Sequence, residues 1–205
     1  MIVLSAEFVK SATDARGWPP AGPDEIAFCG RSNVGKSSAL NALAARKSLA
    51  RVSRTPGRTR LINFFDVRAA EKTRSGGKGE EHHLVFADLP GYGFASGPRD
   101  ERDKWRAMIE EYLTGREALR ALVVLVDGEL GAQPSDVEMV RWGESLGHRI
   151  VVAATKLDKL ARNRRGQQID RIAGQLAVPK VVGISAKELF GVDELWREMV
   201  TKDAR

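Results

Sequence analysis

Six runs of apolar residues, rich in β-branched side chains, alternate along the chain with stretches of helical periodicity. Short runs of this kind predict strands, and those without polar alternation are typical of strands buried on both faces. They cover residues 25–29, 61–67, 83–88, 121–127, 150–155 and 180–184. The pattern therefore predicts a six-stranded sheet.

The segments between these strands carry the spacing of helices. In DKWRAMIEEYL, residues 103–113, apolar side chains recur three and four positions apart, which places them on one helix face that we expect to meet the core. Other helices are predicted at 36–46, 134–146, 164–176 and 192–201. Alternating strands and helices predict an α/β fold with a doubly wound, mostly parallel sheet and helices on both faces.

One pair of strands departs from this alternation. No helical pattern separates 61–67 from 83–88, so we expect an antiparallel hairpin, with one strand of the sheet antiparallel to the rest. The polar, glycine-rich connection predicts a flexible insertion at about 69–82. Residues 1–23 are interpreted as an N-terminal lead-in, and residues 24–205 as a single domain.

The stretch GRSNVGKSS, residues 30–38, follows a predicted strand and precedes a predicted helix. Glycines allow backbone N–H groups to turn toward phosphates, the helix N-terminus favours their charge, and a lysine and a hydroxyl complete the site. Lys36 is expected near the β and γ phosphates, and Ser37 at magnesium. The expected phosphate contacts come from Gly30, Arg31, Ser32, Asn33, Val34, Gly35, Lys36, Ser37 and Ser38.

A second motif, Asp88-Leu89-Pro90-Gly91, ends a hydrophobic strand. A carboxylate there can hold magnesium through a water molecule, and the N–H of Gly91 can meet a γ-phosphate. DxxG alone is a weak signal because a surface turn can produce it. Its position after a buried strand and downstream of a phosphate loop favours nucleotide contact.

Two further motifs follow predicted strands, Thr155-Lys156-Leu157-Asp158 and Ser185-Ala186-Lys187, and Ile184 just before the second is also an expected contact. Asp158 can accept hydrogen bonds from guanine N1–H and the 2-amino group, whereas adenine lacks that pair of donors. The Lys156 stem can lie over the base, and a backbone N–H near Ala186 can reach guanine O6. In this order the motifs favour GTP over ATP.

Together, the segments GRSNVGKSSALNAL, SRTPGRTRLINFF, DLPGYGFA, TKLDKL and SAKELFGVDEL resemble the EngB family of Ras-like P-loop GTPases. The resemblance covers about residues 24–200. It implies a GTP-hydrolysing switch in assembly of the large ribosomal subunit, coupled to cell growth or division. It also assigns Gly57, Arg58 and Thr59 to a first switch, with Thr59 on magnesium and the γ-phosphate; Thr55 is the alternative.

Two positions depart from related patterns. Tyr92 follows DLPG where many switch GTPases carry a water-orienting glutamine. Catalysis is therefore assigned to Lys36, Thr59 and Asn33, with slow intrinsic turnover. Asn33 is either a turn former or, through its amide oxygen, a ligand for a monovalent cation such as K⁺. The second departure is Asp127-Gly128-Glu129-Leu130, which lacks an arginine that many relatives carry.

The formal net charge is +6, and arginines cluster near residues 99–106, 116–120 and 162–171. Basic balance favours a polyanionic partner, here ribosomal RNA or a large-subunit precursor, although solvated helix faces are the alternative. The single cysteine, Cys29, is interpreted as a buried strand residue. A single cysteine fits a reducing cytoplasm, and no apolar run is long enough for a bilayer, so no membrane contact is expected. The protein is also expected to be a monomer.

Two other functions remain open at this level. A metabolic P-loop kinase would need an acceptor site or lid, which no segment suggests, and TKLD and SAK speak against it. A nucleotide-sensing module with negligible hydrolysis is supported by the missing glutamine. Identifying the reaction product would distinguish a kinase from a GTPase. Measuring single-turnover hydrolysis with and without ribosomal particles would distinguish a nucleotide-sensing module from a GTPase.

Overall fold

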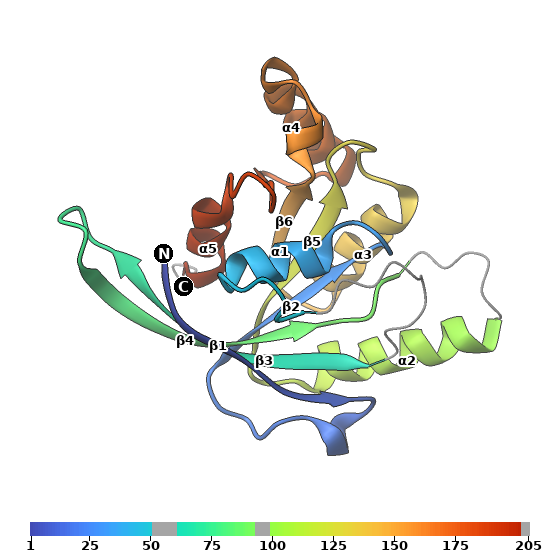
Figure 1. Cartoon of the computed structure of the whole chain (residues 1–205). Helices are drawn as coiled ribbons and strands as arrows, with labels where there is room; N and C mark the ends of the chain where they lie inside the picture. The colour runs from blue at the N-terminus through green and yellow to red at the C-terminus, as the bar shows by residue number, and fades with distance from the viewer. Residues whose placement is uncertain (51–60, 93–98, 202–205) are drawn as a thin grey trace.

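The computed structural model describes residues 1–50, 61–92 and 99–201, with only the backbone of residues 99–102. Within these ranges seven strands form one sheet in the order β1-β3-β4-β2-β5-β6-β7 (Figure 1). The strands are β1 (Ile2–Ala12), β2 (Asp24–Gly30), β3 (Ile62–Lys72), β4 (Lys78–Asp88), β5 (Leu119–Asp127), β6 (Ile150–Thr155) and β7 (Val181–Gly183).

Five α-helices cover the two faces of the sheet over the described ranges. They are α1 (Lys36–Leu43), α2 (Arg99–Gly115), α3 (Pro134–Ser145), α4 (Arg162–Leu176) and α5 (Val192–Val200), with 3-10 turns at Ala15–Gly17 and Leu157–Lys159. One apolar core lies under α1 and α5, and a second lies under α2, α3 and α4. This confirms the doubly wound α/β architecture with helices on both faces.

The direction of the strands follows the hydrophobic pattern. β4, β2, β5, β6 and β7 pair in parallel, and their apolar runs are buried on both sides. β3 is antiparallel to both of its neighbours, β1 and β4, so it is the one strand of the described sheet that runs against the rest. The predicted hairpin and the single antiparallel strand are therefore confirmed.

The predicted number of six strands is wrong, because the lead-in at 1–23 contains β1. This strand pairs along its length with β3, from Ile2 opposite Ala70 to Ala12 opposite Ile62. Phe8 is 56% exposed, so β1 lacks the buried apolar run that identifies the central strands. Its position depends on pairing with residues about sixty positions away, which no local pattern contains.

The predicted insertion at about 69–82 is also mostly strand. β3 continues to Lys72 and β4 begins at Lys78, leaving Thr73–Gly77 as the connection. Gly76 adopts a φ of 85° in this tight turn, and its N–H donates to the carbonyl of Thr73 at 3.0 Å. The polar residues are compatible with strand because the end of the hairpin extends beyond the helices (Figure 1) and buries little side chain.

The parallel register brings the carboxyl ends of five strands, β4, β2, β5, β6 and β7, to one edge of the sheet. Phe28 in β2 lies opposite Asp88 in β4, Gly30 lies opposite Leu125 in β5, and Asp127 lies opposite Thr155 in β6. In open α/β sheets, ligands bind outside this edge. Every motif that the sequence singled out in the described part of the chain therefore follows a strand at the same edge.

Candidate functional site

The loop between β2 and α1 has the backbone needed to enclose an anion. Asn33 and Gly35 adopt left-handed φ values of 65° and 98°. A Cβ at Gly30 would lie 2.9 Å from the carbonyl oxygen of Leu125, so this position has no room for a larger residue. The N-terminus of α1 follows directly at Lys36. Such a turn ahead of a helix N-terminus can hold phosphate groups through N–H donors.

Two residues of the TKLD motif hold this loop through hydrogen bonds to its carbonyl groups. Thr155 Oγ1 donates to the carbonyl of Val34 at 2.6 Å, and Lys156 Nζ donates to the carbonyl of Asn33 at 2.7 Å. Lys156 Nζ also lies 2.6 Å from Asp127 Oδ2. The predicted base-recognition motif is therefore attached to the phosphate loop, although more than one hundred residues separate them.

The DxxG motif, residues 88–91, also contacts the phosphate loop. Asp88 is 5% exposed at the end of β4, and its carboxylate forms an ion pair with Lys36 Nζ. A Cβ at Gly91 would lie 3.2 Å from both the carbonyl oxygen of Gly30 and Ser32 Oγ. A side chain at position 91 would therefore require the phosphate loop to shift by a few tenths of an ångström. The Asp88 carboxylate, the Lys36 ammonium and the phosphate loop thus lie next to one another.

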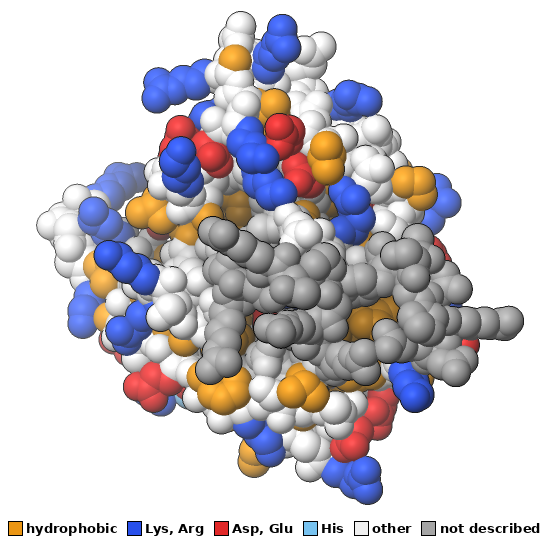
Figure 2. Space-filling model, turned by 45° about the vertical axis from the view of Figure 1, so that its right-hand side comes forward, with side chains coloured by type: hydrophobic (Ala, Val, Ile, Leu, Met, Phe, Trp, Pro, Cys, Tyr) orange, Lys and Arg blue, Asp and Glu red, His pale blue; other side chains and the backbone are white. Residues whose placement is uncertain are grey.

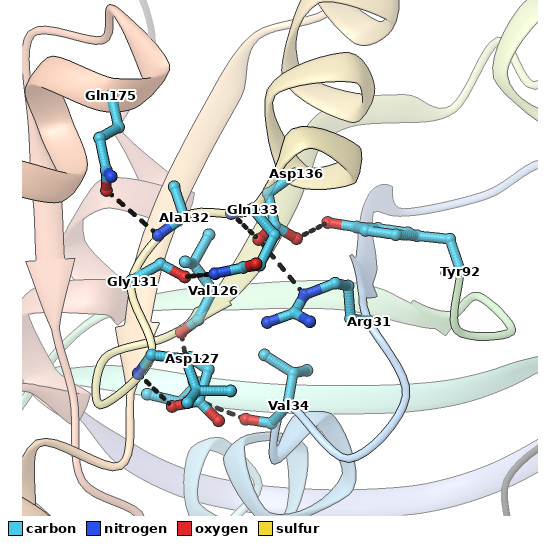
Figure 3. Close-up of polar contacts among 12 residues, drawn as sticks. Arg31, Val34, Tyr92, Val126, Asp127, Gly131, Ala132, Gln133, Asp136 and Gln175 are labelled. Carbon is cyan, nitrogen blue, oxygen red and sulfur yellow. Dashed lines mark hydrogen bonds and ion pairs between the residues drawn. The ribbon is translucent and has the colours of Figure 1, made fainter. Parts of the chain in front are cut away.

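Tyr92 extends this contact with hydrogen bonds in both directions. Its N–H donates to the carbonyl of Gly30 and its carbonyl accepts from the N–H of Ser32, both at 3.2 Å. Its ring is buried, and its hydroxyl donates to Asp136 Oδ1 at 2.9 Å (Figure 3). The hydroxyl is therefore committed to the N-terminal turn of α3, and burial raises the pKa of Tyr92 well above its usual value.

Asp136 joins three parts of the site (Figure 3). This fully buried carboxylate accepts from Tyr92, accepts the N–H of Gln133 at 2.8 Å, and lies 3.4 Å from Arg31 Nε. Its hydrogen bond to Gln133 is half of a capping box that begins α3. Burial raises the pKa of Asp136 despite these donors. Phosphate loop, DxxG motif and α3 are thus fixed to one another by one side chain.

The neighbourhood of Asp158 fits recognition of a base edge. Ser185 Oγ donates to Asp158 Oδ1 at 2.7 Å and accepts the N–H of Glu188 at 3.0 Å. Ser185 is completely buried, so this hydroxyl acts as a support for the carboxylate. Among the described residues, the second carboxylate oxygen of Asp158 has no hydrogen-bond partner.

Several predicted contact positions carry side chains that face the core. Val34, Leu89, Leu157 and Ile184 are each at most 2% exposed, so only their backbone groups can meet a ligand. Pro90 is buried as well, and its carbonyl accepts from Trp105 Nε1 of α2 at 3.0 Å. Gly57, Arg58 and Thr59, with the alternative Thr55, lie outside the described residues.

The sequence analysis did not predict two carboxylates of the site, Asp127 and Asp136. Asp127 accepts the N–H groups of Glu129 and Leu130 in addition to Lys156. Burial alone would raise its pKa, but these donors outweigh burial and hold the pKa of Asp127 below the usual value. Its place at the end of a buried strand was the available signal. For Asp136 the signal was weaker, a capping pattern at the start of a helix.

Cys29 is 1% exposed in β2, and burial raises the pKa of its thiol. This agrees with its interpretation as a buried strand residue. Among the helices that the structure describes, none is long and apolar enough to cross a membrane.

Comparison with known proteins identifies this arrangement. A family model described as 50S ribosome-binding GTPase matches residues 25–156. A probable GTP-binding protein EngB from Anaeromyxobacter sp. (strain Fw109-5) is 49% identical over 201 residues, covering 97% of this chain and 91% of the relative. The chain belongs to the EngB family. An EngB protein of Trichlorobacter lovleyi is 40% identical over the full length of both chains.

Solved structures agree at the level of the fold. A probable GTP-binding protein EngB has a TM-score of 0.61 at 26% identity, covering 84% of this chain and 95% of the other. A variant of Era from Aquifex aeolicus, bound to GDP·AlF4−, has a TM-score of 0.68 at 23% identity, covering 87% of this chain and 57% of the other. This EngB protein is thus a GTP-binding switch and a GTPase with a Ras-like P-loop fold.

Proposed function

We propose that this GTPase acts in the cytoplasm in assembly of the large ribosomal subunit, and that cell growth and division depend on it through that role. The observation that carries the proposal is the match of residues 25–156 to a family model of 50S ribosome-binding GTPases. The net charge of +6 supports a ribosomal RNA partner, since a basic protein is attracted to a polyanion.

Nucleotide binding in this proposal uses the residues at the carboxyl edge of the sheet. The backbone N–H groups of residues 30–38 and Lys36 hold the phosphates, aided by the N-terminus of α1. Asp158 accepts the guanine donors, Lys156 lies over the base plane, and the N–H of Ala186 meets guanine O6. The Gly91 N–H contacts the γ-phosphate, so it distinguishes GTP from GDP.

The donors at this edge fit a magnesium ion. Ser37 offers a hydroxyl in the first turn of α1, and Asp88 a carboxylate oxygen that can act through water; both are hard oxygen ligands of the kind magnesium prefers. Thr59 is assigned as the further ligand by family resemblance. The ion would neutralise charge on the β and γ phosphates. Lys36, beside Asp88, holds the same phosphates in position.

Hydrolysis without a glutamine needs positive charge from another source. Lys36, Asn33 and Thr59 are the residues that we assign to catalysis. The φ of Asn33 fits the turn-forming role, and its exposed side chain leaves the amide oxygen available for K⁺. Such a cation would supply charge that other GTPases obtain from an arginine.

The cation assignment is tested by comparing hydrolysis in potassium and in sodium. We expect faster turnover in potassium, and loss of that difference in Asn33→Ala with GDP affinity retained. Equal rates in both salts, together with an unchanged Asn33→Ala rate, would leave Asn33 with only its turn-forming role.

The ribosomal role is tested by depletion in cells followed by sedimentation of ribosomal particles. We expect fewer mature large subunits and an accumulating large-subunit precursor, restored by the wild-type chain but not by Lys36→Ala. Normal large subunits after depletion would refute the assembly role and leave the GTPase activity unaffected.

A further inference from the structure

Helix α4 carries a polar stripe that the nucleotide site does not use. Arg164, Gln167, Gln168 and Arg171 recur at the spacing of one helix face, and they line a hollow of about 440 Å³ with Glu129 and Leu160. Arg164, Gln167 and Arg171 are exposed. Below, this surface is called the α4 groove.

The charges of the α4 groove are unbalanced. Within the described residues, neither Arg164 nor Arg171 has a carboxylate partner. The neighbouring Arg165 differs, since it pairs with Glu188 at 3.2 Å and lies over the ring of Phe190. Glu129, the one acidic residue lining the groove, is paired with Lys159 at 2.6 Å. The net charge that the groove presents is therefore positive.

The position of the groove connects it to the guanine motif. Gln168 Nε2 donates to the carbonyl of Gly128 at 2.9 Å, directly after Asp127, which holds Lys156. Further along α4, Gln175 accepts the N–H of Ala132 at 3.3 Å (Figure 3). Figure 2 shows Lys and Arg side chains at the upper part of the molecule, where α4 lies. A ligand in the groove would thus lie next to the segment after β5, whose Asp127 pairs with Lys156.

We propose that the α4 groove binds the phosphate backbone of an RNA strand, an inference that rests on the ribosomal role proposed above. Seven residues of helix separate the two arginines by about 10 Å along the helix axis, enough for each to meet a different phosphate of one strand. The guanidinium groups hold phosphate oxygens, and the glutamine amides between them hydrogen-bond to sugar or base edges.

The lining favours RNA over a protein partner. Protein interfaces usually place aromatic or other apolar side chains at their centre, even where arginines take part. In the α4 groove Leu160 is the one apolar lining residue, and the rest are charged groups or amides. Unpaired arginines beside amides match the mostly polar, basic surfaces that bind nucleic acids.

The test is a titration of the full chain, loaded with GDP, with a fluorescently labelled single-stranded RNA of mixed sequence. The variant is Arg164→Gln with Arg171→Gln, which keeps good helix formers on α4. We expect binding to weaken about tenfold or more, and the slope of log affinity against log salt to fall by about 0.7 for each arginine. GTP hydrolysis should be unchanged.

The matched control is Arg46→Gln with Arg74→Gln, which removes the same charge from exposed arginines elsewhere, one of them in the β3–β4 turn. Binding that falls equally in both double variants would indicate only net charge and overturn the α4 groove. Unchanged RNA affinity in the α4 variant would also overturn the proposal. So would binding of a large-subunit protein to the α4 groove in the absence of RNA. Normal large subunits after depletion would instead refute the ribosomal role, whatever the titration gives.

Discussion

At the residue scale, Tyr92 shows how the chain uses the position that often carries a glutamine. Its hydroxyl donates to buried Asp136, so it is turned toward α3 and is unavailable to orient water. Its backbone meanwhile exchanges hydrogen bonds with Gly30 and Ser32. Tyr92 therefore holds the DxxG motif against the phosphate loop, and catalytic charge must come from other groups.

Tyr92→Phe separates these roles. The lost hydrogen bond to a buried carboxylate should lower the free energy of unfolding by about 1–2 kcal/mol, measured by urea titration. GTP turnover at a temperature where both proteins are folded should change by no more than about twofold. Tyr112→Phe is the matched control, because Tyr112 donates to buried Glu25 at 2.8 Å. A turnover loss specific to Tyr92→Phe would contradict a purely structural hydroxyl.

Asp158→Asn tests guanine recognition. Exchanging an acceptor for a donor opposes the guanine donors, so GTP affinity should fall roughly 100-fold or more, while xanthosine triphosphate binds better. Titration with both nucleotides measures the exchange. Asp170→Asn makes the same chemical change on the exposed part of α4 and should alter neither affinity. Unchanged GTP affinity in Asp158→Asn would remove Asp158 from the site.

At the element scale, the close contact between the segment after β5 and the TKLD turn explains a glycine. A Cβ at Gly128 would lie 2.4 Å from the carbonyl oxygen of Thr155 and 2.6 Å from Leu157 Cδ2. The segment cannot retreat without losing the 2.9 Å hydrogen bond from Gly128 N–H to that carbonyl. The glycine at position 128 is therefore explained by packing.

Gly128→Ala should therefore destabilise the protein by about 2 kcal/mol or more and weaken nucleotide binding, since Lys156 must move. Gly166→Ala is the control. A Cβ there meets nothing within 4 Å, so the change should stabilise α4 by about 0.5–1 kcal/mol. Chemical denaturation measures both. If both variants change the free energy of unfolding by equally small amounts, the segment after β5 can shift at little energetic cost.

The elements were predictable where their own residues determine them. The buried runs of β2, β4, β5 and β6 and the apolar face of α2 could be read directly. β1 could not, because its half-exposed residues form a strand only by pairing with β3. The outer part of the β3–β4 hairpin could not be predicted as strand either, because its backbone pairs while its polar side chains remain in solvent.

At the scale of the whole molecule, the parallel register assembles motifs that are distant in the chain. Each motif was predictable alone, because phosphate and guanine chemistry limits the residues that serve it. The contacts between motifs were not, since Asp127 with Lys156 and Asp136 with Arg31 depend on strand order and side-chain direction. The likeness to Era at 23% identity is a likeness of fold, and partners are determined by surfaces.

Turnover is a property of this whole assembly. Without a glutamine after the DxxG motif, the isolated protein should hydrolyse GTP well below about 1 s⁻¹, the low end of typical enzyme rates. Phosphate release should rise several-fold when purified large-subunit particles are added. A rate above that value for the protein alone would mean that its own residues complete the catalytic site.

The hydrogen bond from Trp105 to Pro90 gives the molecule an internal optical reporter. The indole lies on α2 beside Tyr92, with ring centroids 6.4 Å apart, and Pro90 immediately precedes the glycine expected at the γ-phosphate. Exchange of GDP for GTP should therefore shift tryptophan emission, and Trp105→Phe should abolish the shift while Trp142→Phe preserves it. Stopped-flow fluorescence of the isolated protein could then follow each nucleotide turnover without any added label.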